Sequence, residues 1–167
     1  MVESIKSGKI FIYPTDTIYG IGCDATNKQA VEKIRQIKNR DSKPFSVIAP
    51  SFDWIYENCI VDCDLEKYLP GHYTIILKKK NPDFLKWISD NDTIGVRIPA
   101  HEFVENIKEA DVPFITTSVN LSGEKFATCI EEVNKEILNK VDVIVDSGKL
   151  DGQPSTLILD GKEVERK

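Results

Sequence analysis

The residues from Tyr13 to Gly22 combine the side-chain types that bind small polar ligands. This stretch contains Thr15, Thr17 and Tyr19, together with a carboxylate and two glycines, directly after an apolar segment. Its proline ends strand pairing because it lacks a backbone donor, and its glycines allow close backbone approaches. We therefore predict a loop that follows a strand and faces a small polar ligand.

A dense group of positive charges follows at Lys38, Arg40 and Lys43, where a helical pattern ends and a strand pattern begins. Charges of this kind commonly form the solvated face of a helix. In a phosphate site, lysine would act as a mobile point charge and arginine as a planar fork that takes two phosphate oxygens. The spacing alone leaves both interpretations open.

A second polar loop is expected at Ser118 and Asn120, after the apolar strand pattern at residues 113–117. Short polar residues often serve only as turn formers. This loop and the first one both follow the carboxyl end of a predicted strand, however, and open α/β sheets bind ligands in the crevice beyond those ends. Two such loops make a pocket a stronger prediction than one would.

Arg97 and Ser155 are further candidates, although both have simple structural explanations. Arg97 is flanked by a valine and an isoleucine, so it would need a partner if it were buried. A structural carboxylate would serve as well as a ligand. Ser155 lies in Pro154-Ser155-Thr156, which is most simply a turn that leads into a strand.

Several familiar chemistries are missing from the sequence. It has neither the Gly-rich run of a P-loop nor a dinucleotide-binding fingerprint. His72 and His101 have no serine or cysteine nucleophile motif beside them, so we interpret both as structural or surface residues. Cys59 and Cys63 lack the second pair or the histidine of a zinc site, so we assign no metal site to the protein. A cationic, hydroxyl-rich pocket would instead position reactants and stabilise charge in phosphate chemistry.

The composition limits the partners of the protein. The formal charge of −5, from 22 basic and 27 acidic residues, argues against a broad nucleic-acid surface. No apolar run approaches the roughly 20 residues that span a bilayer. The four cysteines are scattered through a chain that starts without a signal segment, so we interpret them as reduced thiols. We expect a cytoplasmic protein with no membrane association.

Interleaved strand and helix patterns predict one α/β domain over residues 1–167, with a twisted mixed sheet flanked by helices. Strand patterns occur at residues 9–13, 45–49, 74–77, 93–98, 113–117, 141–145 and 156–159, and a hairpin turn follows the last of them. Helical patterns occur at 2–7, 54–58, 65–69, 84–88 and 103–110. Thr26-x-x-Gln29 and Thr128-x-x-Glu131 resemble capping boxes that begin two further helices.

Together these residues resemble the YrdC-like family of threonylcarbamoyl-adenylate synthases, from Lys9 to about Leu159. Five motifs occur in the family's order: Tyr-Pro-Thr-Asp-Thr-Ile-Tyr-Gly-Ile-Gly-Cys-Asp at 13–24, Lys38-Asn39-Arg40 followed by Lys43-Pro44, Gly95-Val96-Arg97-Ile98-Pro99, Ser118-Val119-Asn120-Leu121-Ser122-Gly123, and Pro154-Ser155-Thr156. Five matches in order are hard to obtain by chance.

The resemblance implies a nucleotidyltransferase that joins L-threonine, bicarbonate and ATP, with Mg²⁺, into threonylcarbamoyl-adenylate and releases pyrophosphate. The product would supply the carbamoyl-threonine group for an adenosine beside the anticodon of certain tRNAs, through a separate tRNA threonylcarbamoyl transferase complex. A weak contact with tRNA is a further expectation. The resemblance also implies a deep, positively charged concave site in a single-domain form that lacks the extra carboxy-terminal domain of longer relatives.

Carried over position by position, the resemblance implies two groups of site residues. Lys38, Arg40, Ser118 and Asn120 would be the catalytic residues around the nucleotide phosphates, with Lys43 and Arg166 as additional phosphate contacts. Thr15, Thr17, Tyr19, Arg97 and Ser155 would surround the threonine, and Arg97 would pair with its carboxylate. The chain departs from the family's pattern at Asp41 and at His72-Tyr73.

Two alternatives belong to other functional classes. A non-catalytic RNA-binding module would use the same basic concavity, although the net charge disfavours it. A carbamoyl-transfer domain of the hydrogenase-maturation type shares the fold, but such domains normally occur in much longer chains. Pyrophosphate release that depends on threonine would distinguish the synthase from both.

Overall fold

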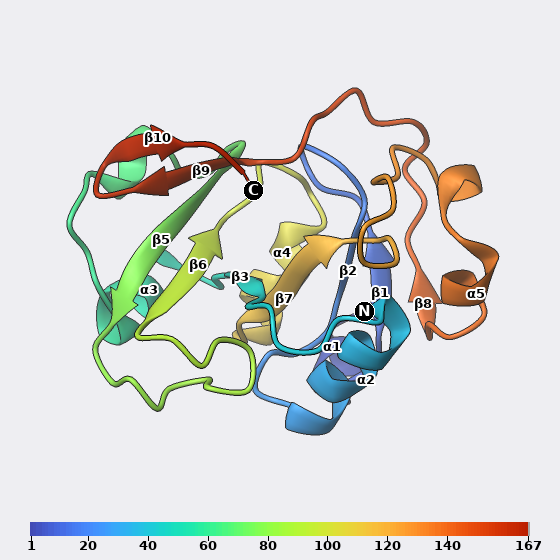
Figure 1. Ribbon diagram of the computed structural model, residues 1–167, viewed down its shortest axis with the longest axis horizontal. Helices are drawn as coiled ribbons and strands as arrows, with labels where there is room; N and C mark the ends of the chain where they lie inside the picture. The colour runs from blue at the N-terminus through green and yellow to red at the C-terminus, as the bar shows by residue number, and fades with distance from the viewer. Residues whose placement is uncertain (167) are drawn as a thin grey trace.

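A computed structural model describes residues 1–166, and one large mixed sheet organises them (Figure 1). The strands are β1 (Phe11–Tyr13), β2 (Gly20–Gly22), β3 (Ser46–Ile48), β4 (Cys59–Ile60), β5 (Tyr73–Lys79), β6 (Thr93–Arg97), β7 (Phe114–Ser118), β8 (Val143–Ile144), β9 (Thr156–Leu159) and β10 (Lys162–Val164). The helices are α1 (Val2–Lys6), α2 (Lys28–Lys38), α3 (Phe52–Asn58), α4 (Val104–Ala110) and α5 (Lys135–Leu138), with 3₁₀ turns η1 (Leu65–Lys67) and η2 (Ile130–Glu132).

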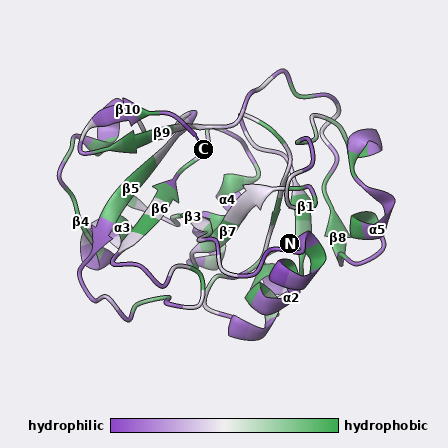
Figure 2. Ribbon diagram, viewed as in Figure 1, coloured by the Kyte–Doolittle hydropathy of each residue, from purple (hydrophilic) through white to green (hydrophobic). Residues whose placement is uncertain are grey.

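The order of the strands confirms a mixed α/β fold. Across the described residues the order is β10-β9-β5-β6-β3-β7-β2-β1-β8, and β4 pairs with β5 outside this path. The pairs β1 with β8, β3 with β6, and β5 with β9 are parallel. The remaining pairs are antiparallel. Figure 2 shows β5, β6 and β9 as largely hydrophobic, as expected for strands that pack in a core.

The two polar loops predicted from the sequence meet because β1, β2 and β7 are neighbours. Tyr13, at the end of β1, lies opposite Gly20, and Gly20 lies opposite Ser118 at the end of β7. Since both pairings are antiparallel, β1 and β7 run in the same direction. The loops that follow them therefore emerge at one edge of the sheet, as predicted.

Gly20 and Gly22 lie in β2 rather than in the loop that precedes it. A Cβ atom on Gly22 would overlap the carbonyl oxygen of Ile115 and the ring of Phe114, and one on Gly20 would lie 3.0 Å from the ring of Tyr13. These glycines therefore allow β2 to pack closely against its neighbours, and the polar residues before them form the loop.

Helix α2 carries the first cationic motif to the sheet. It begins after Asn27, whose side chain accepts a hydrogen bond from the backbone N–H of Ala30 at 3.0 Å. The cap expected at Thr26 is therefore wrong by one residue. The helix ends at Lys38, and Asn39 adopts a left-handed φ of 54° that turns the chain away from the helix axis.

Two helices predicted from local patterns are absent from the described structure. Residues 84–88 form turns. Residues 128–137 divide into η2 and α5, because the carboxylate of Glu132 accepts a hydrogen bond from the backbone N–H of Thr128 at 2.7 Å and Asn134 caps a new helix. No helix among residues 1–166 has the length and apolarity to cross a membrane.

Candidate active site

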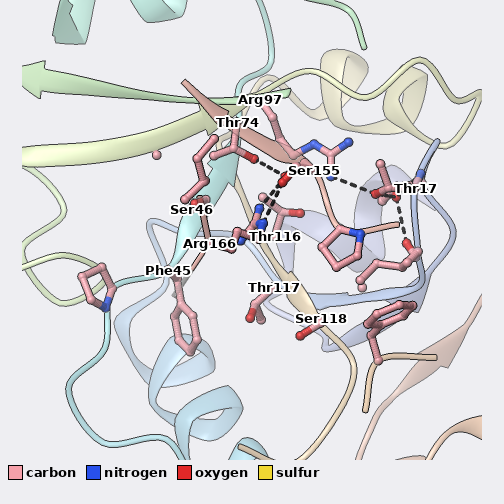
Figure 3. Close-up of a pocket in the computed structure, with 18 of the residues that line it drawn as sticks. Thr17, Phe45, Ser46, Thr74, Arg97, Thr116, Thr117, Ser118, Ser155 and Arg166 are labelled. Carbon is pink, nitrogen blue, oxygen red and sulfur yellow. Dashed lines mark hydrogen bonds between the residues drawn. The ribbon is translucent and has the colours of Figure 1, made fainter. Parts of the chain in front are cut away.

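A cavity of about 670 Å³ opens where the two polar loops meet the sheet (Figure 3). Nine residues identified from the sequence line it: Thr15, Thr17, Tyr19, Arg40, Arg97, Ser118, Asn120, Ser155 and Arg166. Lys38 and Lys43 are outside its lining. The structure therefore brings together residues that lie as much as 151 positions apart in the chain, from Thr15 to Arg166.

Hydroxyl side chains from four strands also line the cavity, and sequence reasoning missed them. They are Ser46 on β3, Thr74 on β5, Thr93 on β6 and Thr116 on β7. Each occurs in a short strand among apolar residues, so the alternation of polar and apolar residues was an available signal. The signal did not identify a pocket, because it does not show which strands are neighbours.

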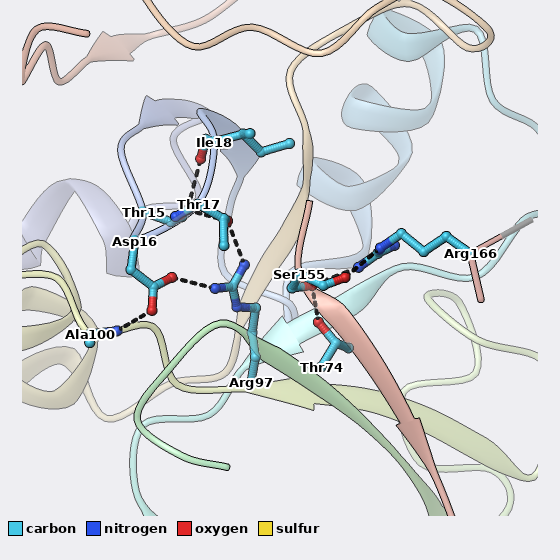
Figure 4. Close-up of polar contacts among 9 residues, drawn as sticks. All are labelled: Thr15, Asp16, Thr17, Ile18, Thr74, Arg97, Ala100, Ser155 and Arg166. Carbon is cyan, nitrogen blue, oxygen red and sulfur yellow. Dashed lines mark hydrogen bonds and ion pairs between the residues drawn. The ribbon is translucent and has the colours of Figure 1, made fainter. Parts of the chain in front are cut away.

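Arg97 and Asp16 form a buried ion pair at the end of β6 (Figure 4). The guanidinium donates to Asp16 at 2.5 Å and to the hydroxyl of Thr17 at 3.3 Å. Burial lowers the pKa of Arg97, while the negative charge of Asp16 acts in the opposite direction. The structural carboxylate that the sequence left open is therefore Asp16, although Arg97 still lines the cavity.

The three hydroxyls of the first motif have different partners. Thr15 donates to the carbonyl of Ile18 at 2.8 Å and accepts from the backbone N–H of Thr17 at 3.0 Å, so it closes the turn. The hydroxyl of Thr17 lies 2.9 Å from that of Thr15 and also accepts from Arg97. Tyr19 points elsewhere: its hydroxyl donates to the carbonyl of Gly148 at 2.7 Å. Of the three, Thr17 is therefore best placed to contact a ligand beside Arg97.

Ser155 connects Arg166 to the sheet. Its hydroxyl lies 2.6 Å from that of Thr74 and accepts from Nη2 of Arg166 at 2.6 Å, while its carbonyl accepts from Nε of the same arginine. Burial and the nearby charge of Arg97 lower the pKa of Arg166. Arg166 therefore contacts Ser155, one of the residues expected around threonine.

Arg40 is held in the wall of the cavity by contacts on several sides. Its guanidinium donates to the carbonyl of Pro44 at 2.6 Å and lies 4.9 Å from the ring centroid of Phe45. Arg35 packs on the same ring at 4.4 Å, and its charge adds to burial in lowering the pKa of Arg40. Among the described residues, the buried side-chain nitrogens without a hydrogen-bond partner are Nε of Arg40 and Nε of Arg97. Both belong to arginines that line the cavity, and a buried donor without a partner costs free energy.

The loop at Ser118 forms a small hydrogen-bond network. The hydroxyl of Ser118 donates to Oδ1 of Asn120 at 2.8 Å, and Nδ2 of Asn120 donates to the carbonyl of Glu124 at 2.6 Å. Lys38 lies behind this loop and is only 1% exposed. Lys43 is exposed, and its carbonyl accepts a hydrogen bond from Arg35.

The charges of the lining favour an anionic ligand. Among the described residues, the cavity is lined by four cations and one carboxylate. The cations are Arg40, Arg97, Arg166 and Lys125, and the carboxylate is Glu124. Asp16 neutralises one of these cations. Residues 1–166 contain no group of three or more histidine, cysteine or carboxylate side chains arranged to hold a metal ion. The arrangement suits an anionic substrate held by guanidinium and hydroxyl groups.

A family model named Sua5/YciO/YrdC, described as telomere recombination, matches residues 3–166. The chain belongs to this family. It is 41% identical over 164 residues to a putative threonylcarbamoyl-AMP synthase of Methanocaldococcus jannaschii, a match that covers 93% of this chain and 76% of that protein.

Two solved structures share the fold. The P. abyssi Sua5 complex with L-threonine has a TM-score of 0.82 and 29% identity, and the match covers 95% of this chain. Full-length HypF in its phosphate- and nucleotide-bound form has a TM-score of 0.83 and 26% identity, over 95% of this chain. The chain spans about half of P. abyssi Sua5 (49%) and 26% of HypF.

Proposed function

We propose that the protein is an L-threonylcarbamoyladenylate synthase, which forms threonylcarbamoyl-AMP and pyrophosphate from L-threonine, bicarbonate and ATP. The observation that carries this proposal is that one cavity is lined by two different sets of polar groups. Arg40, Ser118 and Asn120 suit phosphate oxygens, whereas Arg97 and Thr17 suit an amino acid. Figure 3 draws Arg97 and Thr17 apart from Phe45 and Ser118, which agrees with two adjacent subsites.

The chemistry requires charge to be stabilised more than it requires a covalent nucleophile. The amine of threonine attacks CO₂ and loses a proton, or attacks bicarbonate with loss of water, to give a carbamate. A carbamate oxygen then attacks the α-phosphorus of ATP while pyrophosphate leaves. Both reactants are anions, so Arg40 would reduce their repulsion and stabilise the departing pyrophosphate. A well-placed charged donor in such a site contributes about 3 kcal/mol to lowering the barrier.

Mg²⁺ would enter as part of the ATP substrate. The described chain offers no cluster of carboxylates to hold a resident ion, and most of the charged residues that line the cavity are cations. The triphosphate, in contrast, supplies the oxygen ligands that Mg²⁺ prefers. Bound in this way, the ion would neutralise part of the phosphate charge beside Arg40.

The product would be passed to a tRNA threonylcarbamoyl transferase complex, and a weak contact with tRNA belongs to the same proposal. The net charge of −5 disfavours the rival RNA-binding function, because RNA is a polyanion that binds mainly to basic surfaces. We place the reaction in the cytoplasm.

The test is an assay of pyrophosphate release with purified protein, ATP, Mg²⁺ and bicarbonate. We expect release only when L-threonine is added, with D-threonine and L-serine as matched controls for stereochemistry and for the methyl group. Release that does not depend on threonine would refute the proposal. A requirement for carbamoyl phosphate would instead favour the carbamoyl-transfer function.

A further inference from the structure

Lys38 anchors the Ser118 loop by its backbone and its side chain. It is the last residue of α2, and its carbonyl accepts a hydrogen bond from the backbone N–H of Ser122 at 2.9 Å. Its ammonium group lies on the inner side of the same loop. Because Lys38 is 1% exposed and outside the cavity lining, its contacts are with protein groups.

The ammonium group uses all of its donors within the loop. It donates to the carbonyl of Ser118, to the carbonyl of Asn120 at 3.0 Å, and to Oδ1 of Asn120 at 2.9 Å. A lysine ammonium has three N–H donors and no acceptor. In this arrangement, none of the three remains for a phosphate oxygen.

These contacts fix which way the Asn120 carboxamide faces. Its Oδ1 accepts from both Lys38 and the hydroxyl of Ser118, so its Nδ2 must point the other way, where it donates to the carbonyl of Glu124. A neutral side chain in place of Lys38 would remove the donor that selects this orientation. The side chains of Ser118 and Asn120, which do line the cavity, therefore depend on Lys38.

We infer that Lys38 is a positioning residue, which acts on the nucleotide through the Ser118 and Asn120 side chains and does not bind phosphate itself. This inference rests on the proposed function in one respect, since it takes ATP as the ligand of those side chains. It differs from the role that the sequence resemblance implied for Lys38, a direct contact with the phosphates.

The electrostatics of the site agree with this geometry. Burial and the nearby charge of Arg40 lower the pKa of Lys38 to about 7. The hydrogen bonds to the three loop oxygens act in the opposite direction, because they favour the charged form. The ammonium group is therefore held by protein oxygens, while its burial makes it easier to deprotonate than an exposed lysine.

The first test compares Lys38→Met with Lys33→Met in protein without ligand. Lys33 is an exposed lysine of the same helix, so its variant removes the same charge but no loop contact. Hydrogen exchange of the backbone amides at 119–124 should become about tenfold faster in Lys38→Met, while β1 and β7 keep their protection. Lys33→Met should match the wild type. Unchanged exchange in the Lys38 variant would overturn the inference.

The second test measures ATP affinity by calorimetry and introduces Lys38→Met both into the wild type and into a Ser118→Ala/Asn120→Ala variant. If Lys38 acts through these two side chains, its replacement should not weaken ATP binding further in the variant that lacks both of them. Additive losses would show that Lys38 contacts ATP directly, and they too would overturn the inference. If the wild type binds no ATP, the proposed function fails, whereas the exchange experiment still decides the positioning role. Should Lys38→Met not fold, Lys38→Ala replaces it, since alanine favours the helix and also removes the ammonium donors.

Discussion

Asp16 joins two separate segments through its ion pair with Arg97. One carboxylate oxygen accepts from Nη2 of Arg97 at 2.5 Å, and the other accepts from the backbone N–H of Ala100 at 2.8 Å. The side chains of both ionic partners are 6% exposed. The position of the Thr15–Tyr19 loop therefore depends on one buried carboxylate, which sequence reasoning did not select.

Asp16→Ala should lower the free energy of unfolding by about 3 to 5 kcal/mol, because it leaves the Arg97 charge buried without its partner. Urea denaturation monitored by circular dichroism would measure this change. Glu105→Ala is the matched control, since Glu105 pairs with Lys108 on the surface and its loss should cost less than about 1 kcal/mol. Similar effects for the two variants would contradict the structural role of Asp16.

Tyr19→Phe should reduce stability without weakening threonine binding. The hydroxyl of Tyr19 accepts from the backbone N–H of Ser147 at 2.9 Å and donates to the carbonyl of Gly148. Its removal should cost about 1 to 3 kcal/mol in unfolding free energy, because both backbone groups lose a partner. The KM for threonine should stay within about twofold, because the hydroxyl is bonded to backbone groups of residues that do not line the cavity. Tyr56→Phe, at an exposed tyrosine, is the control for stability. A large rise in the KM of Tyr19→Phe for threonine would mean that the Tyr19 hydroxyl contacts threonine.

Much of the fold could be predicted because it depends on local patterns. The pattern at residues 93–98 predicts β6 (Thr93–Arg97) to within one residue, since β-branched residues alternate there and a proline follows. The pattern at 128–137 fails because the actual capping contact joins Thr128 to Glu132 and not to Glu131. A difference of one residue at a helix start cannot be read from residue types alone.

Site residues that belong to a loop motif could be predicted from the sequence. Site residues that reach the cavity because of the order of the strands could not. Thr17 and Ser118 were identified, and both line the cavity. Thr74 was not, because its place in the cavity arises from β5 lying between β6 and β9. The resemblance predicts Lys38 as a phosphate contact, whereas its burial behind the Ser118 loop is a property of the tertiary structure.

Arg40→Ala should lower threonine-dependent pyrophosphate release about 100-fold, because the guanidinium would stabilise charge that develops at the phosphates. Arg40→Lys should restore little of it, since a lysine lacks the planar fork that takes two oxygens. Lys43→Ala is the matched control, as Lys43 is exposed and outside the cavity lining. Steady-state kinetics of all three variants, with circular dichroism to verify folding, would check this. Equal losses in the Arg40 and Lys43 variants would mean that only the overall charge matters.

The pH dependence of stability should reveal the buried charge of Lys38. Its pKa is lowered from 10.5 to about 7 in the folded protein by burial and by Arg40. Below pH 7 both states carry the proton, so Lys38 adds no pH dependence there.

Above that pH the unfolded chain binds the proton and the folded protein does not, so folding is favoured increasingly up to about pH 10. The stability of the wild type relative to Lys38→Met should therefore rise with pH, by at most about 1.4 kcal/mol per pH unit. Urea denaturation of both proteins from pH 6 to pH 10 would measure this difference, in which other titrating groups cancel. A difference that stays flat above pH 7 would mean that Lys38 keeps its proton in the folded protein, and one that falls would mean that folding raises the pKa of Lys38.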